Sequence, residues 1–320
     1  MTLMQRPEER PARRQFLCNA GAWLAGVAVW PTGCRSRLPV LEVVRVDAFT
    51  LPPLADSLPA PRTLTCDRHG RILVLDDGGR VLRFFPDRTL DTLWPMPASE
   101  IGNPEGVCVL RDGRILVADT HYDRVVVFSD SGELLETWGT KGDGPGQFQW
   151  PVAVAEDDRG FVYVAEYGGR NRVQKFDASG RFLTAWGGHG TKPGLFQRPS
   201  GVVWLDGALF VADAFNNRIQ VFDDDGRLLR ILPPEVSDWI PSYPYDIAAG
   251  QRDDLFVVEY RAGCVTRLDP QGRCLGRFGS PGSALGQFHT PWGLTLPDVR
   301  TVWVADTGNR RIVELRLQID

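Results

Sequence analysis

The sequence predicts an all-β fold, a propeller of six four-stranded blades, on two observations. One short pattern occurs six times: an apolar strand that ends in an acidic residue, a tight turn, and a second strand that usually begins with arginine. The acidic residues lie 43, 47, 47, 46 and 47 residues apart, at Asp76, Asp119, Glu166, Asp213, Glu259 and Asp306. Each full copy also has room for four short strands, and a four-stranded repeat of this period is one propeller blade.

The second copy shows the four strands most clearly. Residues 104–109, 115–118, 124–128 and 134–138 are rich in Val, Ile and Leu, and clusters of Gly, Asp and Ser separate them. Short β-prone runs bounded by such turn residues are typical of antiparallel hairpins. The second copy is therefore expected to fold as a four-stranded meander.

The same pattern sets the blade boundaries and predicts how the ring closes. Blades are expected at about residues 62–94, 103–138, 151–186, 199–232, 244–278 and 291–317. The sixth copy has only three strands, whereas residues 41–49 form a strand outside the repeats. We expect residues 41–49 to be the missing fourth strand, because closure removes exposed sheet edges. The propeller domain is thus predicted over residues 41–320.

Two stretches of the sequence resemble NHL repeats. They are Tyr163–Gly187 and Phe210–Leu229, and the phrase Gly-Gln-Phe before a new blade, at 146–148 and 286–288, strengthens the likeness. The resemblance covers about residues 60–317 and implies a six-bladed propeller of the NHL type. It implies no single function, because such a fold hosts many.

The N-terminal segment resembles an export signal. Arg13-Arg14-Gln15-Phe16-Leu17 precedes a weakly apolar run over residues 19–30, which is too short to span a bilayer. This arrangement is similar to a bacterial twin-arginine (Tat) signal. We therefore expect residues 1–34 to direct export and the mature protein to be periplasmic or held on the outer side of the cytoplasmic membrane. Gly33-Cys34 suits lipid attachment at Cys34, and cleavage by an ordinary signal peptidase nearby is the alternative that the sequence leaves open.

Composition is that of a soluble globular domain with many turns. Apolar residues make up 43% and charged residues 24%, the formal net charge is −4, and there are 34 Gly and 24 Pro. Nucleic-acid binding usually depends on a basic face, which this charge does not support. We expect a monomer without a cofactor, whose partner is an envelope protein, a peptide or a glycan.

The six acidic residues are expected to gather on one face, where they have two interpretations. They could bind a cation or a basic ligand. They could instead pair with the arginine that follows each acid except Glu259 by four to six residues, at Arg80, Arg124, Arg172, Arg218 and Arg311. The second interpretation, a structural ion pair repeated in each blade, is favoured. Cys264 occupies the arginine position after Glu259, which makes Glu259 the carboxylate to examine for binding.

A binding surface is predicted on this turn face and on the linker 233–243. The linker lacks the Gly-x-Phe phrase and contains aromatic residues, and irregular loops on a rigid scaffold often bind ligands. The predicted ligand-binding residues are Glu166, Tyr167, Arg170, Phe215, Trp239, Tyr243, Glu259, Tyr260 and Arg261. The alternatives are that the linker has merely diverged and that ion pairs consume the arginines.

Histidines and cysteines give little support to catalysis. An amidating lyase related to the NHL propellers uses zinc held by three histidines, but the predicted inner strands contain none of His69, His121, His189 and His289. We predict no metal ligands and no catalytic residues. Cys66, Cys108, Cys264 and Cys274 are expected to be free, although the sequence does not fix their redox state.

The favoured function is therefore an extracytoplasmic, non-catalytic binding or scaffold protein. The alternative is a propeller enzyme, related to the peptidyl-hydroxyglycine amidating lyase or acting as a hydrolase in the central funnel.

Overall fold

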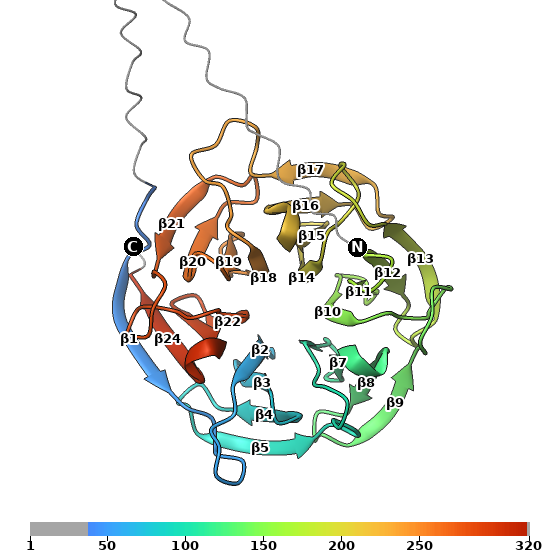
Figure 1. Ribbon diagram of the computed structural model, residues 1–320, viewed down its shortest axis with the longest axis horizontal. Helices are drawn as coiled ribbons and strands as arrows, with labels where there is room; N and C mark the ends of the chain where they lie inside the picture. Colours follow the sequence, from blue (N-terminus) through green and yellow to red (C-terminus); the bar gives the residue numbers. More distant parts are fainter. Residues whose placement is uncertain (1–37, 319–320) are drawn as a thin grey trace, which may run out of the picture. The chain divides into compact units, whose positions relative to one another are not determined.

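The computed structural model describes residues 38–318, which form six four-stranded antiparallel sheets. The sheets surround a central axis as the blades of a propeller (Figure 1). Five blades follow the chain order from the axis to the rim, as in β2-β3-β4-β5. The predicted all-β, six-bladed propeller is confirmed. Among the described residues, no helix is long and apolar enough to cross a membrane.

Every blade has one strand at each of four positions between the axis and the rim. The innermost strands are β2 (Pro61–Cys66), β6 (Gly106–Val109), β10 (Pro151–Glu156), β14 (Pro199–Leu205), β18 (Pro244–Ala249) and β22 (Gly293–Asp298). The second strands are β3 (Ile72–Asp76), β7 (Ile115–Asp119), β11 (Val162–Glu166), β15 (Ala208–Asp213), β19 (Leu255–Glu259) and β23 (Thr301–Asp306). The third strands are β4 (Arg80–Phe84), β8 (Arg124–Phe128), β12 (Arg172–Phe176), β16 (Arg218–Phe222), β20 (Cys264–Leu268) and β24 (Arg311–Leu317). The outermost strands are β5 (Leu90–Pro95), β9 (Leu134–Trp138), β13 (Phe182–Gly187), β17 (Leu228–Leu232), β21 (Cys274–Phe278) and β1 (Val43–Phe49).

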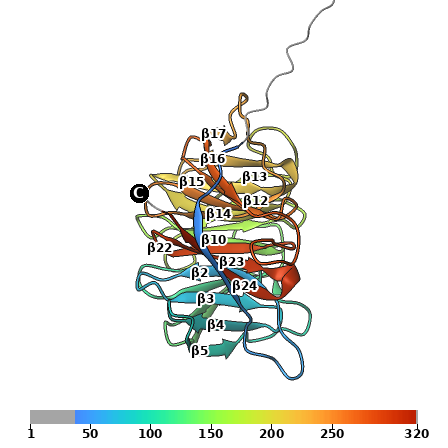
Figure 2. The same cartoon turned by 90° about the vertical axis from the view of Figure 1, so that its left-hand side faces the viewer.

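The first and last strands close the ring, as predicted. β1 pairs antiparallel with β24, from Val43 opposite Leu317 to Phe49 opposite Ile312. Figures 1 and 2 both show β1 lying along the outer edge of β24. The Phe49 ring contacts Trp303 of the same blade at 5.1 Å between centroids and Phe84 of the first blade at 5.9 Å. β1 therefore completes blade 6 and also packs it against blade 1.

Successive blades adhere through a repeated aromatic contact. A tryptophan on an outermost strand packs on the phenylalanine that ends the third strand of the next blade. The pairs are Trp94–Phe128 and Trp186–Phe222, each at 5.9 Å, and Trp138–Phe176 at 6.3 Å. All three phenylalanines are buried. Such pairs typically contribute about 0.5–1.5 kcal/mol beyond the burial of their area. Similar aromatic contacts therefore stabilise the packing between blades 1 and 2, 2 and 3, and 3 and 4.

On one face, an ion pair ties the second strand to the third in five of the six blades. In blade 4, Nε of Arg218 lies 2.7 Å from Oδ2 of Asp213. The remaining guanidinium nitrogens donate to the carbonyl oxygens of Thr191, Lys192 and Leu195 in the loop from blade 3. Arg218 thus joins two blades while neutralising a carboxylate with no exposed surface.

The same pairing recurs, with one substitution. Arg172 and Arg311 likewise bind their acid and three carbonyl groups of a Gly-x-Phe loop each. Arg80 and Arg124 also pair with their acids. The predicted structural ion pairs are therefore confirmed in these blades. In blade 5, where Cys264 replaces the arginine, Glu259 pairs with Arg277 of β21 at 3.0 Å.

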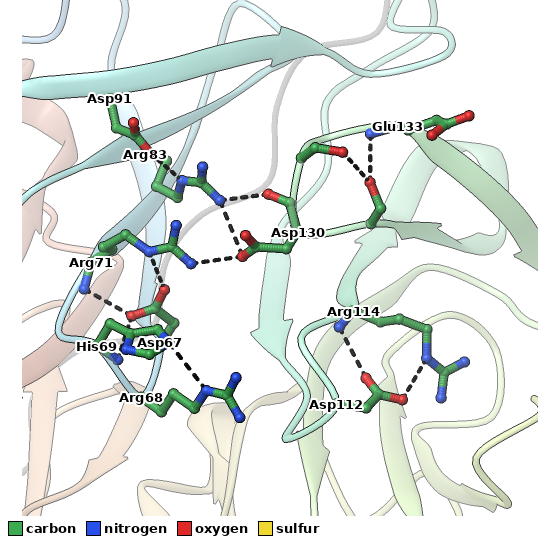
Figure 3. Close-up of polar contacts among 12 residues, drawn as sticks. Asp67, Arg68, His69, Arg71, Arg83, Asp91, Asp112, Arg114, Asp130 and Glu133 are labelled. Atoms are coloured by element: carbon green, nitrogen blue, oxygen red, sulfur yellow. Dashed lines mark hydrogen bonds and ion pairs between the residues drawn. The ribbon is translucent and has the colours of Figure 1, made fainter.

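On the opposite face of the ring, a second set of ion pairs links neighbouring blades. Arg71 and Arg83 of blade 1 both bind the carboxylate of Asp130, in the turn between β8 and β9 of blade 2 (Figure 3). Asp67 and Asp91 hold the same two arginines in place. In the same way, Lys175 of blade 3 binds Asp224 of blade 4, so charged turns fasten the outer parts of neighbouring blades.

Candidate functional site

The start of each innermost strand has the same two-residue pattern, a proline followed by a variable residue. The variable residues occupy equivalent places around one end of the channel and are Arg62, Glu105, Val152, Ser200, Tyr245 and Trp292. All except Arg62 line a central cavity of about 320 Å³ that extends between the innermost strands. We call this end of the channel the mouth.

The residue before the proline adopts a left-handed backbone in four blades. The φ angles are 56° at Trp150, 60° at Arg198, 59° at Tyr243 and 46° at Thr290. A residue before proline normally prefers an extended backbone, and such conformations usually cost about 1–3 kcal/mol each and concentrate at functional sites. Three of these four residues carry aromatic or arginine side chains to the mouth.

Each of these three strained residues is fixed by a side chain from the preceding blade. Asp123 accepts the backbone N–H of Trp150 at 3.0 Å. Asn171 and Asn217 accept those of Arg198 and Tyr243, both at 2.8 Å. Asp and Asn suit this task because they tolerate the left-handed turn positions that they occupy. The turn of one blade therefore sets the conformation of the next blade's mouth residue.

The mouth side chains form a continuous set of ring contacts centred on Tyr245. Its ring lies 5.2 Å from Trp292, 5.8 Å from Tyr260 and 5.9 Å from Tyr243. Tyr243 also contacts Phe215, at 5.2 Å. We call the whole set the Tyr245 cluster; its members are Arg62, Glu105, Trp150, Tyr167, Arg198, Phe215, Tyr243, Tyr245, Tyr260, Arg261 and Trp292. Phe215 is 53% exposed, so the cluster has an open apolar surface.

Arginines extend the Tyr245 cluster across the mouth. Arg198 lies over the Tyr167 ring at 4.1 Å, and the Tyr167 ring in turn contacts Trp150 at 5.3 Å. Arg62 lies over Trp292 at 4.5 Å, and Arg261 over Tyr243 at 5.1 Å. Cation–π contacts of this kind are typically worth about 0.5–2 kcal/mol.

A carboxylate neutralises one of these arginines. Nη2 of Arg198 donates to the Tyr245 hydroxyl at 2.9 Å, and that hydroxyl donates to Glu105 at 3.3 Å. Glu105 also lies 3.5 Å from Arg198 and is almost fully buried. Burial, together with Glu105, keeps the pKa of Tyr245 well above its usual value, so the phenol stays neutral at physiological pH.

Below the mouth, Asp246 stands out among the cavity residues. The equivalent positions in the other blades are Thr63, Gly106, Ala153, Gly201 and Gly293. Small residues suit this place because a Cβ on Gly201 would lie 2.8 Å from Cα of Asp246. The Asp246 carboxyl accepts backbone N–H groups of Ile247 at 2.9 Å and Leu294 at 3.2 Å. Burial raises the pKa of Asp246 to about 7.

Deeper in the cavity the lining includes Cys108, Arg111 and Glu156. The Arg111 backbone N–H donates to Glu156 at 2.7 Å, while its guanidinium is bound by Asp158. Burial raises the pKa of Glu156 above its usual value and that of Cys108 to about 12. The thiol is therefore protonated, and Cys66, Cys108, Cys264 and Cys274 are free in the structure.

The structure separates the nine predicted ligand-binding residues into three groups. Tyr167, Phe215, Tyr243, Tyr260 and Arg261 come together in the Tyr245 cluster. Arg170 is exposed and lies 3.5 Å from Asp143 instead.

The other three residues lie inside the protein. Glu166 is buried and holds Arg172 and the N–H of Gln149. Glu259 is fully buried and accepts the indole N–H of Trp239 at 3.1 Å. The linker 233–243 thus turns Trp239 inward, where it helps to replace the arginine missing from blade 5, while Val236 and Ile240 stay exposed.

The remaining members of the Tyr245 cluster, and Asp246, were not predicted from the sequence. Those members are Arg62, Glu105, Trp150, Arg198, Tyr245 and Trp292. A usable signal was present, because the residues on either side of each inner-strand proline vary between blades while the prolines recur. Their variation at a repeated position distinguishes them from structural residues of the repeat.

No convergent metal ligands are found in the described part of the chain. Nδ1 of His121 lies 3.1 Å from the Asn103 carbonyl oxygen, and Nδ1 of His189 lies 3.4 Å from the Asn171 amide. None of the residues that line the central cavity between residues 38 and 318 is a histidine.

Comparisons with known proteins agree with the fold. A family model for the NHL repeat matches residues 102–128, which supports the resemblance over one repeat. Among solved structures, the chain is similar to a streptogramin B lyase, with a TM-score of 0.60 and 15% identity over 86% of this chain and 98% of that chain. A catalytically inactive histidine-to-alanine variant of virginiamycin B lyase from Staphylococcus aureus, with quinupristin, gives a TM-score of 0.57 and 15% identity over 86% and 99%.

A structural genomics protein of unknown function from Bacteroides thetaiotaomicron gives a TM-score of 0.61 and 15% identity over 85% of this chain and 72% of that chain. A search of the curated proteins found no match. At 15% identity these similarities establish the fold alone.

Proposed function

We propose that this protein is an extracytoplasmic, non-catalytic binding propeller that holds a segment of an envelope protein or peptide on the Tyr245 cluster. The observation that supports it is the continuous surface of aromatic and arginine side chains drawn from five blades around the mouth. These residue types dominate the binding energy of protein interfaces. A glycan, which can also stack on aromatic rings, is the other ligand class to test.

A peptide array and a glycan array, probed with the purified propeller, test this role. Phe215→Ala and Trp150→Ala remove rings that are 53% and 46% exposed, so they can weaken binding without opening the core. We expect at least a tenfold loss of affinity for any ligand that the arrays identify. Leu229→Ala is the matched control, because Leu229 is 46% exposed on the outer strand β17. Binding that survives both aromatic substitutions would refute the assignment to the mouth.

The extracytoplasmic location is supported by the twin-arginine segment and by Gly33-Cys34, which lie outside the described residues. Replacing Arg13 and Arg14 together by lysine should leave the protein in the cytoplasmic fraction. Cys34→Ser should release a lipid-anchored protein from membranes into the soluble envelope fraction. A soluble envelope location in the unaltered protein would instead indicate ordinary cleavage.

A lyase is the second candidate, favoured by the fold shared with streptogramin B lyase and by the Asp246 carboxyl in the central cavity. The absence of histidine from the described cavity lining weighs against a mechanism like that of the related enzyme whose histidine-to-alanine variant is inactive. Liquid chromatography with tandem mass spectrometry of quinupristin incubated with the protein distinguishes the candidates. Conversion of quinupristin to a new product that Asp246→Asn abolishes would establish catalysis and displace the binding role.

A further inference from the structure

The central cavity has an excess of acidic side chains. Among the described residues that line it, the carboxyl groups are those of Glu105, Glu156 and Asp246, and the one basic residue is Arg111. Glu105 is neutralised by Arg198, and the Arg111 guanidinium is already bound by Asp158, which does not line the cavity. Within the described chain, Glu156 and Asp246 form no ion pair. The cavity therefore contains two carboxyl groups whose charge no protein side chain directly balances.

Asp246 is the better placed of the two to meet a ligand. It follows Tyr245 directly, so it lies one residue below the aromatic mouth, whereas Glu156 ends its strand at the far side. Among residues 38–318, its hydrogen-bond donors are the two backbone N–H groups of Ile247 and Leu294. These fix the carboxyl but supply no net positive charge. A buried carboxylate without a counter-ion is costly, and a cationic ligand would remove that cost.

The walls above Asp246 also suit a cation. Tyr245 and Trp292 line the upper part of the cavity, and aromatic faces attract ammonium groups. A volume of about 320 Å³ is at the small end of ligand pockets, which typically span about 300–1,000 Å³. It is large enough for one long side chain or a small amine. A primary ammonium group fits best, because its three donors can be shared between a carboxylate and cavity water.

We propose that the central cavity binds the primary ammonium group of its ligand, such as a lysine side chain of a bound peptide, with Asp246 as counter-ion. This proposal rests on the binding role of the Tyr245 cluster and adds the chemical class of the ligand. The peptide backbone lies on the cluster, and one basic side chain enters the channel beside Tyr245.

Binding and proton loss are then coupled. Asp246 must ionise to pair with the ammonium, so affinity falls as the pH drops below about 7, the pKa to which burial raises this carboxyl. The charged and titratable groups around it are Tyr245, Glu105, Arg111, Glu156, Cys66 and Cys108. Burial raises the pKa values of Tyr245 and both thiols above their usual values, so these three remain neutral across the range. Burial also raises the pKa of Glu156. A control variant at Glu156 is therefore needed to show which carboxyl group causes the pH dependence.

Calorimetric titration with Nα-acetyl-lysine N-methylamide, whose side-chain ammonium group is free, tests the proposal. Nα-acetyl-norleucine N-methylamide is the uncharged control. We expect the lysine compound to bind about 100-fold more weakly at about pH 5 than at about pH 8. The norleucine compound should bind weakly and equally at both. Absence of lysine-compound binding at about pH 8, or binding that does not depend on pH, would overturn the proposal.

Two variants assign the effect to one carboxyl. Asp246→Asn should weaken binding of the lysine compound at least tenfold at about pH 8 and abolish its dependence on pH. Glu156→Gln, in the same cavity, should change affinity less than threefold. The reverse result would place the counter-ion at Glu156 and refute the assignment to Asp246. Thermal unfolding of Asp246→Asn should show an intact fold.

The array experiment separates this proposal from the binding role itself. Suppose that Phe215→Ala and Trp150→Ala leave array binding intact while the lysine compound still binds through Asp246. The proposed binding role of the Tyr245 cluster is then refuted, and the proposed ammonium site in the cavity is supported. If binding of the array ligands depends on the Phe215 and Trp150 rings but the lysine compound does not bind, only the proposed ammonium site at Asp246 is refuted.

Discussion

Arg218→Ala measures what one ion pair contributes to this ring. The substitution removes the bond to Asp213 at 2.7 Å and three bonds to carbonyl groups of the loop from the preceding blade. Asp213 has no exposed surface and Arg218 is only 13% exposed, so water cannot readily replace the lost partner. Removing one member of a buried ion pair usually costs about 3–5 kcal/mol.

We expect a value near the lower limit, about 3 kcal/mol, because Asp213 keeps other donors. The backbone N–H of Gln197 binds it at 2.7 Å, the Asn216 amide at 2.8 Å and the Gln220 amide at 3.1 Å. The bonds to the Thr191 and Lys192 carbonyl groups are exposed, so water can replace Arg218 there, and the Leu195 carbonyl keeps the Gln220 amide as a donor, so the loss of these three bonds adds little.

Urea unfolding followed by tryptophan fluorescence gives the free energy of unfolding by linear extrapolation. Arg181→Ala is the matched control: Arg181 pairs with Asp177 at 2.9 Å but is 77% exposed. Exposed pairs usually contribute about 0–1 kcal/mol. If the two variants differ by less than about 0.5 kcal/mol, burial does not set the strength of these pairs and the reasoning is wrong.

Three further outcomes follow from the structure. Asp246→Asn should nearly match the unaltered protein near pH 4 and be about 4 kcal/mol more stable near pH 8, measured by urea unfolding at both. Burial raises the pKa of Asp246 to about 7, so the protonated form is favoured on folding and its stabilising contribution is lost as the pH rises through that value. Deleting residues 38–49 should expose the edge of β24 and cause association, visible as higher mass in light scattering after gel filtration; a stable monomer would show that closure is dispensable. Trp239→Phe should lower the free energy of unfolding in urea by about 1–3 kcal/mol, because the hydrogen bond from the indole N–H to Glu259 is lost with little change in packing. An unchanged urea midpoint would contradict this role of Trp239.

The sequence was sufficient for the ring because its signals are local or repeated. The spacing of residues such as Asp213 and Arg218 fixes a turn between neighbouring strands, and the pair then forms within one hairpin. Residues 41–49 could be placed because only one blade lacked a strand. Partners that are close in the chain, or that are required by symmetry, can be inferred without a structure.

The site was predicted only in part, for a physical reason. Tyr245 meets Trp292, and Tyr243 meets Phe215, because neighbouring blades bring these residues together, and no spacing in the chain encodes either contact. Glu259 shows the same limit. Its missing arginine was visible as Cys264, but its replacement by Arg277 and Trp239 depends on the register of β21 and the path of the linker.

The pairing of β1 with β24 has a mechanical consequence. Val43, at the start of β1, lies opposite Leu317, at the end of β24, so both strands leave the blade at the same point. A force that pulls these two ends apart would open the ladder from that point, one or two hydrogen bonds at a time, instead of shearing all of them together. A load carried through the N-terminal side of β1 would therefore peel this strand from β24 and open the ring at the contact that closes it.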